Sequence, residues 1–110
     1  MLVNLTPHTL NIQCSDGSIY TLEPCGEEAR VDVDFQPYLD ISAGDLSIPT
    51  ALAVTGDLTG LPEPQDGVIY ITSLVVAQLV RRDDVLSPGP LQRDEAGRVI
   101  GCKGLTRHVA

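Results

Sequence analysis

A histidine directly after a proline is the first residue in this sequence that could do chemistry. The stretch VNLTPHTL, residues 3 to 10, is apolar on both sides of Thr6, Pro7 and His8. Because proline cannot donate to a sheet ladder, Pro7 ends or bends a first strand and leaves His8 on a turn. Turns held by rigid strands carry many binding residues. We expect Asn4, Thr6 and His8 to line one side of a pocket, and a plain structural corner is the alternative.

A second candidate group follows the apolar segment VIYI, residues 68 to 71. This segment predicts a buried strand, and Thr72 and Ser73 supply an N-cap for a helix after it. The free amides at a helix N-terminus suit a phosphate or a carboxylate. We therefore expect Tyr70, Thr72 and Ser73 to form the floor of the pocket, and an N-cap facing the interior is the alternative. The sequence lacks the glycine-rich motifs of standard nucleotide-binding folds.

The third group is the mixed-charge run from Arg81 to Asp84. An arginine held by a neighbouring aspartate can bind a carboxylate or phosphate with two parallel hydrogen bonds when it borders a cleft. We expect Arg82 with Asp83 at the rim of the pocket. The alternative is a solvated helix end.

Catalytic groups are harder to find than binding groups. Ser73 could be combined with His8 or His108, but no G-x-S-x-G motif surrounds it, and many such combinations can be drawn by chance. The paired carboxylates lie in polar, turn-rich segments that do not predict a raised pKa. We assign no catalytic residue and no cofactor, and expect binding rather than turnover, with a small hydrolase or transferase as the third hypothesis.

The cysteines indicate a cytoplasmic protein. There are three of them, an odd number, with no C-x-x-C spacing, and no targeting segment is visible. A metal site built from three thiols and His8 is the weaker hypothesis, so we assign no metal ligand.

The charge balance restricts the partners. Fifteen acidic against seven basic residues give a net charge of −8, which repels nucleic acid and anionic membranes. The longest apolar stretch, residues 68 to 80, is shorter than the ~20 residues of a membrane span. We expect a small anionic ligand or a host protein as partner, with no direct binding of nucleic acid or membrane.

Alternating residues predict strands in the first half of the chain. Asp16 and Gly17 predict a hairpin between the strands on either side of them. In the strand from Arg30 to Phe35, Val31, Val33 and Phe35 should face the core. Residues 36 to 49 indicate irregular chain, Gly56 and Gly60 bracket a turn, and residues 60 to 67 form a stiff loop. The predicted strands are 2–5, 10–14, 19–22, 30–35 and 51–54.

One helix and a second hairpin are predicted in the other half. LVVAQLVRR, residues 74 to 82, is apolar on most sides and indicates a buried helix, with a strand as the alternative. Ser87 to Pro90 should interrupt regular structure, residues 90–93 and 98–102 should pair, and residues 106–110 should fray. At 110 residues the chain predicts a single domain, 1–110. We expect an α+β fold, mostly β, in which a small curved antiparallel sheet or partial barrel packs on one short helix, with homo-oligomers formed through exposed sheet edges.

Three segments of the sequence resemble a group of small phage and prophage proteins whose members open with a similar NLTPH. These are residues 3–12, 60–78 and 82–105, about half of the chain. The resemblance implies a phage accessory protein in the cytoplasm of a bacterial host. We expect it to sequester a phosphorylated or nucleotide-derived host immune signal. The alternative is an acidic inhibitor that binds a host protein directly.

Overall fold

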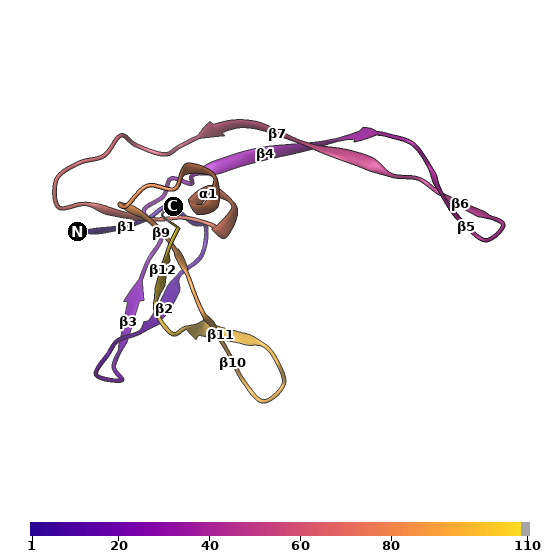
Figure 1. Cartoon of the computed structure of the whole chain (residues 1–110). Coiled ribbons are helices and arrows are strands. Elements are labelled where there is room, and N and C mark those ends of the chain that lie inside the picture. Colours follow the sequence, from indigo (N-terminus) through magenta and orange to yellow (C-terminus); the bar gives the residue numbers. More distant parts are fainter. Residues whose placement is uncertain (109–110) are drawn as a thin grey trace.

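A computed structural model describes residues 1–108 of the chain, which form a small central body and projections that leave it (Figure 1). The central body, here called the hub, consists of four paired strands and the helix α1. Two hairpins extend from the hub in one direction, and a long ribbon, here called the arm, extends in another. The elements are β1 (Leu2–Asn4), β2 (Leu10–Gln13), β3 (Ile19–Leu22), β4 (Arg30–Pro37), β5 (Ile41–Ala43), β6 (Leu46–Ile48), β7 (Ala51–Thr59), β8 (Ile69–Ile71), α1 (Leu74–Val80), β9 (Val85–Pro88), β10 (Leu91–Arg93), β11 (Val99–Cys102) and β12 (Leu105–Arg107).

The hub sheet has the order β1-β8-β9-β12. Neighbours β1, β8 and β9 are parallel, and only β12 runs antiparallel to β9. The helix α1 connects β8 to β9, so these elements form a short β-α-β unit. Apolar side chains from the sheet, from the helix and from the segments that follow β1 and precede β4 make the core. It consists of Leu5, Ala29, Tyr70, Val76, Ala77 and Val85.

A second sheet holds the two hairpins in the order β10-β11-β2-β3. The two hairpins join where Cys102 of β11 pairs in parallel with Ile12 of β2. The backbones are very close at this join, because a Cβ atom on Gly101 would lie 2.7 Å from the carbonyl oxygen of Asn11. Gly101 therefore permits the contact between the hairpins.

The arm comprises residues 30–59. Its long strands β4 and β7 pair antiparallel, and the small hairpin β5-β6 forms its tip. In the described structure of residues 1–108, no residue of the arm is buried. Its half-buried residues are Val31 and Leu58, both at its base, and Thr50. The radius of gyration is 17.7 Å, against about 13 Å for a compact domain of this length.

The predicted fold class, α+β and mostly β with one short helix, is confirmed. The strands are spread over four small sheets, none closed into a barrel, and the hub sheet is mainly parallel. Both predicted hairpins are present, and Gly17 and Gly97 occupy their turns with positive φ. The N-cap at Ser73 is also confirmed, since its side chain accepts a hydrogen bond from the amide of Val76.

Several details of the sequence analysis are wrong. Val33 and Phe35 do not face a core, because the ribbon that carries them has no layer packed on it: their exposed fractions are 42% and 72%. Gly56 lies inside β7 instead of beginning a turn. The helix is only half enclosed, with Leu74, Val75 and Leu79 exposed.

Four strands lie where the sequence analysis expected irregular chain. Residues 36–49 contain β5 and β6, Ser87 belongs to β9, and residues 105–107 form β12 instead of a frayed tail. The last two residues of the predicted tail, 109 and 110, lie outside the described part of the chain. Within residues 1–108 no helix is long and apolar enough to cross a bilayer.

Candidate functional site

Asn4 and Thr6, predicted as ligand contacts, hold the chain together after β1. Asn4 Nδ2 donates to the backbone oxygens of His8 and Leu22, at 2.8 and 3.1 Å. Its Oδ1 accepts from the amide and the hydroxyl of Thr6, at 3.0 and 2.7 Å. Asn4 is 1% exposed, so its amide is fully used inside the protein. These bonds fix the corner at which His8 stands.

His8 is exposed and borders a groove of about 480 Å³ between the two hairpins. The groove is lined mostly by apolar side chains, among them Leu10, Leu91 and Ile100. It runs along β2 and β11 and is bordered by Pro88 of β9, and none of its lining residues belongs to α1. His8 is therefore separated from the predicted floor of the pocket.

Tyr70, Thr72 and Ser73 also have internal partners. Tyr70 is 2% exposed, and its hydroxyl donates to the backbone oxygen of Glu63 at 3.3 Å. The Thr72 hydroxyl donates to the backbone oxygen of Ser73 at 3.0 Å. Ser73 caps a helix of seven residues and faces a different, smaller hollow beside Val31 and Val76.

Arg82 forms an ion pair with Asp84, not with Asp83 as predicted. Arg82 Nε and Nη2 donate to the two carboxylate oxygens at 2.9 and 2.6 Å, while Nη1 donates to the backbone oxygen of Pro62 at 3.2 Å. The hydrogen bonds from Arg82 hold the pKa of Asp84 below its usual value of 3.8. All three nitrogens of the guanidinium have partners, so Arg82 ties the loop before β8 to the turn after α1. Asp83 is exposed.

The predicted residues thus come together only in part. Asn4 and Ile71 are register partners in β1 and β8, so Thr6 and Thr72 follow neighbouring strand ends. His8, Ser73 and Thr6 each border a different hollow, in place of the one pocket that we expected.

A cationic hollow lies elsewhere in the hub. It has a volume of about 570 Å³, and we call it the cationic hollow. Its lining residues are Gln78, Arg81, Arg107 and His108. Gln78 and Arg81 come from α1 and its C-cap, and Arg107 and His108 come from the end of β12. Three residues that can carry positive charge thus meet in a protein whose net charge is −8.

Local backbone geometry positions the two arginines. Arg81 adopts a left-handed conformation with φ of 49°, and its amide donates to the Ala77 carbonyl, which ends the helix. Arg107 pairs with Leu86 in the β12-β9 register. Its Nη1 donates to the backbone oxygen of Asp83 at 2.9 Å, which leaves other guanidinium donors for a ligand.

His108 is held in place by Ser87, since the Ser87 hydroxyl and His108 Nε2 are 2.8 Å apart. This is a serine–histidine pair, but Ser87 is 1% exposed within β9 and is closed to substrates. No carboxylate within residues 1–108 is hydrogen bonded to this histidine. The hydrogen bond to Ser87 therefore orients the His108 ring, but the described residues supply no acidic third member of a catalytic triad.

The cationic hollow could have been found from the distribution of charge. Six of the seven lysine and arginine residues lie from Arg81 to Arg107, whereas eleven of the fifteen acidic residues precede them. Such asymmetry between parts of a chain indicates a charged binding surface. In the sequence analysis Arg81 was assigned to a helix end and Arg107 to a frayed tail, so the two were not considered together.

The cysteine, histidine and acidic side chains of the described residues do not converge on a metal site. Within residues 1–108 no group of three or more histidine, cysteine or acidic side chains is arranged to hold a metal ion. Cys14, Cys25 and Cys102 are free thiols with half-buried, exposed and buried positions.

The chain was compared with known proteins in three ways. No family model matches it, no curated protein is detectably similar in sequence, and no solved structure is detectably similar in fold. The chemistry of the residues around the cationic hollow is therefore what indicates a function.

Proposed function

We propose that this chain is a binding protein that captures a small phosphorylated ligand in the cationic hollow without transforming it. The observation that carries the proposal is the meeting of Arg81, Arg107 and His108 around one cavity of about 570 Å³. Guanidinium groups bind phosphate oxygens with short, charge-assisted hydrogen bonds. Gln78 adds an amide that can donate to a further oxygen.

The lining also limits the class of ligand. Among residues 1–108, no aromatic ring other than the imidazole of His108 lines the hollow, so a nucleobase would have little to stack on. The geometry favours recognition of the phosphate over recognition of a base. A sugar phosphate or the phosphate end of a nucleotide fits this chemistry.

We propose the biological setting from the resemblance of three segments of the sequence to small phage and prophage proteins. A phage accessory protein that binds a phosphorylated host immune signal would lower the free concentration of that signal without enzymatic turnover. The buried Ser87 hydroxyl supports binding over catalysis, because the serine nearest to a histidine is closed to a substrate.

Isothermal titration calorimetry with inorganic phosphate, ribose 5-phosphate and adenosine monophosphate tests this proposal. Heat with the phosphorylated compounds, and none with ribose or adenosine, is the expected result. The double variant Arg81→Gln and Arg107→Gln should weaken binding at least about tenfold, because two charged hydrogen-bond donors are lost. Arg98→Gln is the matched control, since Arg98 lies on the β10-β11 turn and pairs with Asp94.

Absence of heat with every phosphate compound would contradict the proposal, as would equal weakening by the control. The ligand should also be recovered chemically unchanged after the protein is denatured. Recovery of a product would favour an enzyme instead.

An acidic inhibitor that binds a basic host protein is the second candidate function. The arm favours it, because residues 30–59 contain five aspartates and a single basic residue, Arg30. A complex of this kind should weaken as salt is raised. Capture experiments with Asp40→Asn and Asp45→Asn, both at the exposed end of the arm, would test whether these carboxylates contribute.

A further inference from the structure

The arm has one face without charged residues. Side chains of directly opposed residues in an antiparallel pair lie on the same face. The pairs Val33–Thr55, Phe35–Ala53 and Pro37–Ala51 therefore share one face of the ribbon, and Asp34–Val54 and Gln36–Leu52 share the other. We call the first set the apolar face of the arm.

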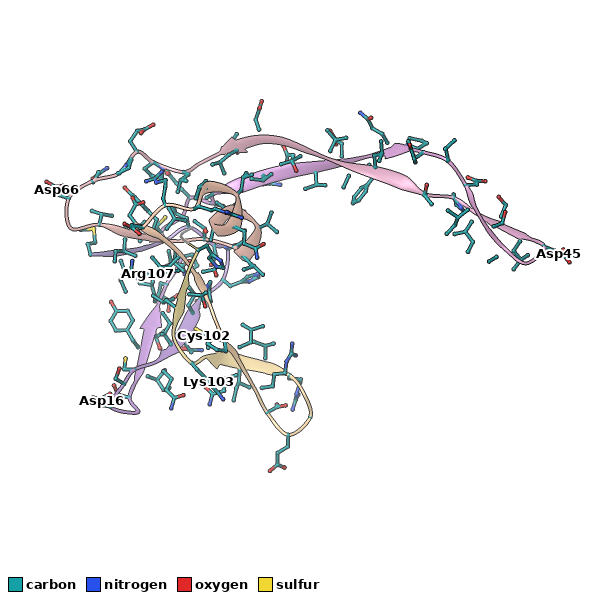
Figure 2. All side chains as sticks on the ribbon, viewed as in Figure 1. Asp16, Asp45, Asp66, Cys102, Lys103 and Arg107 are labelled. Carbon is teal, nitrogen blue, oxygen red and sulfur yellow. The ribbon has the colours of Figure 1, made fainter. Side chains whose placement is uncertain are left out.

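The tip repeats this separation. Ile41 pairs with Ile48 and Ala43 with Leu46, which places four apolar residues on one face, while Ser42 and Ser47 lie on the other. Ile41 is 55% exposed and Leu46 is 72% exposed. Figure 2 shows the outer part of the arm, out to Asp45 at its tip, with no other part of the chain beside it.

This exposure is costly for an isolated ribbon. A two-stranded hairpin is at best marginally stable alone in water, and stable examples pack a face on something else. Large exposed apolar patches mark interaction sites in soluble proteins. The arm thus has the composition of a surface that is covered in the functional state.

The chain as a whole exposes more surface than a compact protein of its mass, enough for one standard interface. The accessible surface is 7685 Å², whereas a compact protein of this mass exposes about 5,900 Å². The excess of about 1,800 Å² exceeds the roughly 800 Å² that each partner contributes to a standard interface. A second copy of this chain offers the same apolar face, and twofold pairing makes such a face complementary to itself.

We infer that two copies of this chain associate through the apolar faces of their arms. Face-to-face packing encloses Phe35 and Val33 of both copies and keeps Asp34 on the outer face, so the acidic charge does not oppose the contact. Pairing of strand edges would not distinguish the two faces in this way. This inference is independent of the ligand proposed for the cationic hollow.

Sedimentation velocity on the full chain tests the inference. The wild type should sediment as a species of twice the 11.7 kDa chain mass at micromolar concentration. Phe35→Glu places a charge on the apolar face and should weaken association at least about tenfold. Gln36→Glu, the next residue on the other face, adds the same charge and should change association less than about twofold.

Ala53→Glu, opposite Phe35, provides a second variant on the same face. Circular dichroism of each variant tests whether the hub stays folded. A monomeric wild type would overturn the inference. Equal effects of Phe35→Glu and Gln36→Glu would also overturn it, because edge pairing would then explain the contact. If the wild type instead forms an assembly larger than a dimer, its dissociation by Phe35→Glu and not by Gln36→Glu would support the arm contact.

Discussion

The hub and the arm use the same types of apolar residue in opposite ways. In the hub, Ile71 and Val85 are fully enclosed, whereas on the arm Phe35 and Leu46 are each 72% exposed. Both regions have paired strands, so backbone pairing does not by itself produce a core. The difference indicates that the hub encloses its apolar side chains within the chain, whereas the arm leaves its own exposed.

The largest expected effect on stability comes from truncating an isoleucine side chain to alanine in each of the two regions. Ile71→Ala should lower the free energy of unfolding by about 2–5 kcal/mol, because it leaves a cavity in the hub. Ile41→Ala on the arm tip should lower it by less than about 0.5 kcal/mol in the monomer. Urea unfolding of the two variants at low protein concentration measures both. Similar losses at the two positions would break the comparison.

The junction of hub and arm gives the next effect. A Cβ on Gly60 would lie 2.1 Å from the Glu28 carbonyl oxygen, and its φ is +81°. Gly60→Ala should therefore destabilise the fold by about 2–4 kcal/mol, from the clash and the left-handed backbone. Gly17 is the control, because its φ is +87° and a Cβ added there would meet no atom within 4 Å.

Gly17→Ala should cost only about 1 kcal/mol, from backbone strain alone. Thermal unfolding of both variants distinguishes the two contributions. Equal shifts in melting temperature would show that the close contact at the arm's base is easily relieved.

The smallest effect depends on pH and involves the Arg82–Asp84 pair of the hub. Because the folded pKa of Asp84 is lowered below its usual 3.8, the pair stabilises the fold above that pH and loses this contribution as pH falls through the folded value. The two side chains are 25% and 20% exposed, so Asp84→Asn should cost about 1 kcal/mol at pH 7.

The difference between wild type and Asp84→Asn should shrink below about pH 4. Asp34→Asn, on the exposed arm, should leave the stability unchanged across this range. Chemical unfolding from pH 7 to pH 3 provides the measurement. A constant difference at all pH values would contradict the assigned role of the ion pair.

The sequence predicted local structure better than it predicted burial. Asp16-Gly17 and Gly97 specify hairpins through their own backbone preferences, and Ser73 specifies a helix cap, so short-range reasoning was sufficient. The alternation of Val33 and Phe35 indicated a strand with one apolar face. It could not indicate whether that face meets the same chain or another one.

The candidate site was less predictable because side-chain partners depend on the fold. The sequence predicted a corner at Thr6, Pro7 and His8, but the hydrogen bonds around Asn4 are complete only once the chain returns as Leu22. Arg107 and His108 come beside Arg81 because β12 pairs with β9, a contact between distant segments. A tail that is expected to fray gives no reason to consider them.

The strands of the arm leave and re-enter the hub side by side, since Arg30 pairs with Thr59. Residues can therefore be added to or removed from both strands of the ribbon without moving the rest of the molecule. Each residue added to both strands extends the reach by about 3.3 Å, and additions in twos preserve which side chains point to which side. Related chains could thus differ in the length of the arm while keeping the hub unchanged.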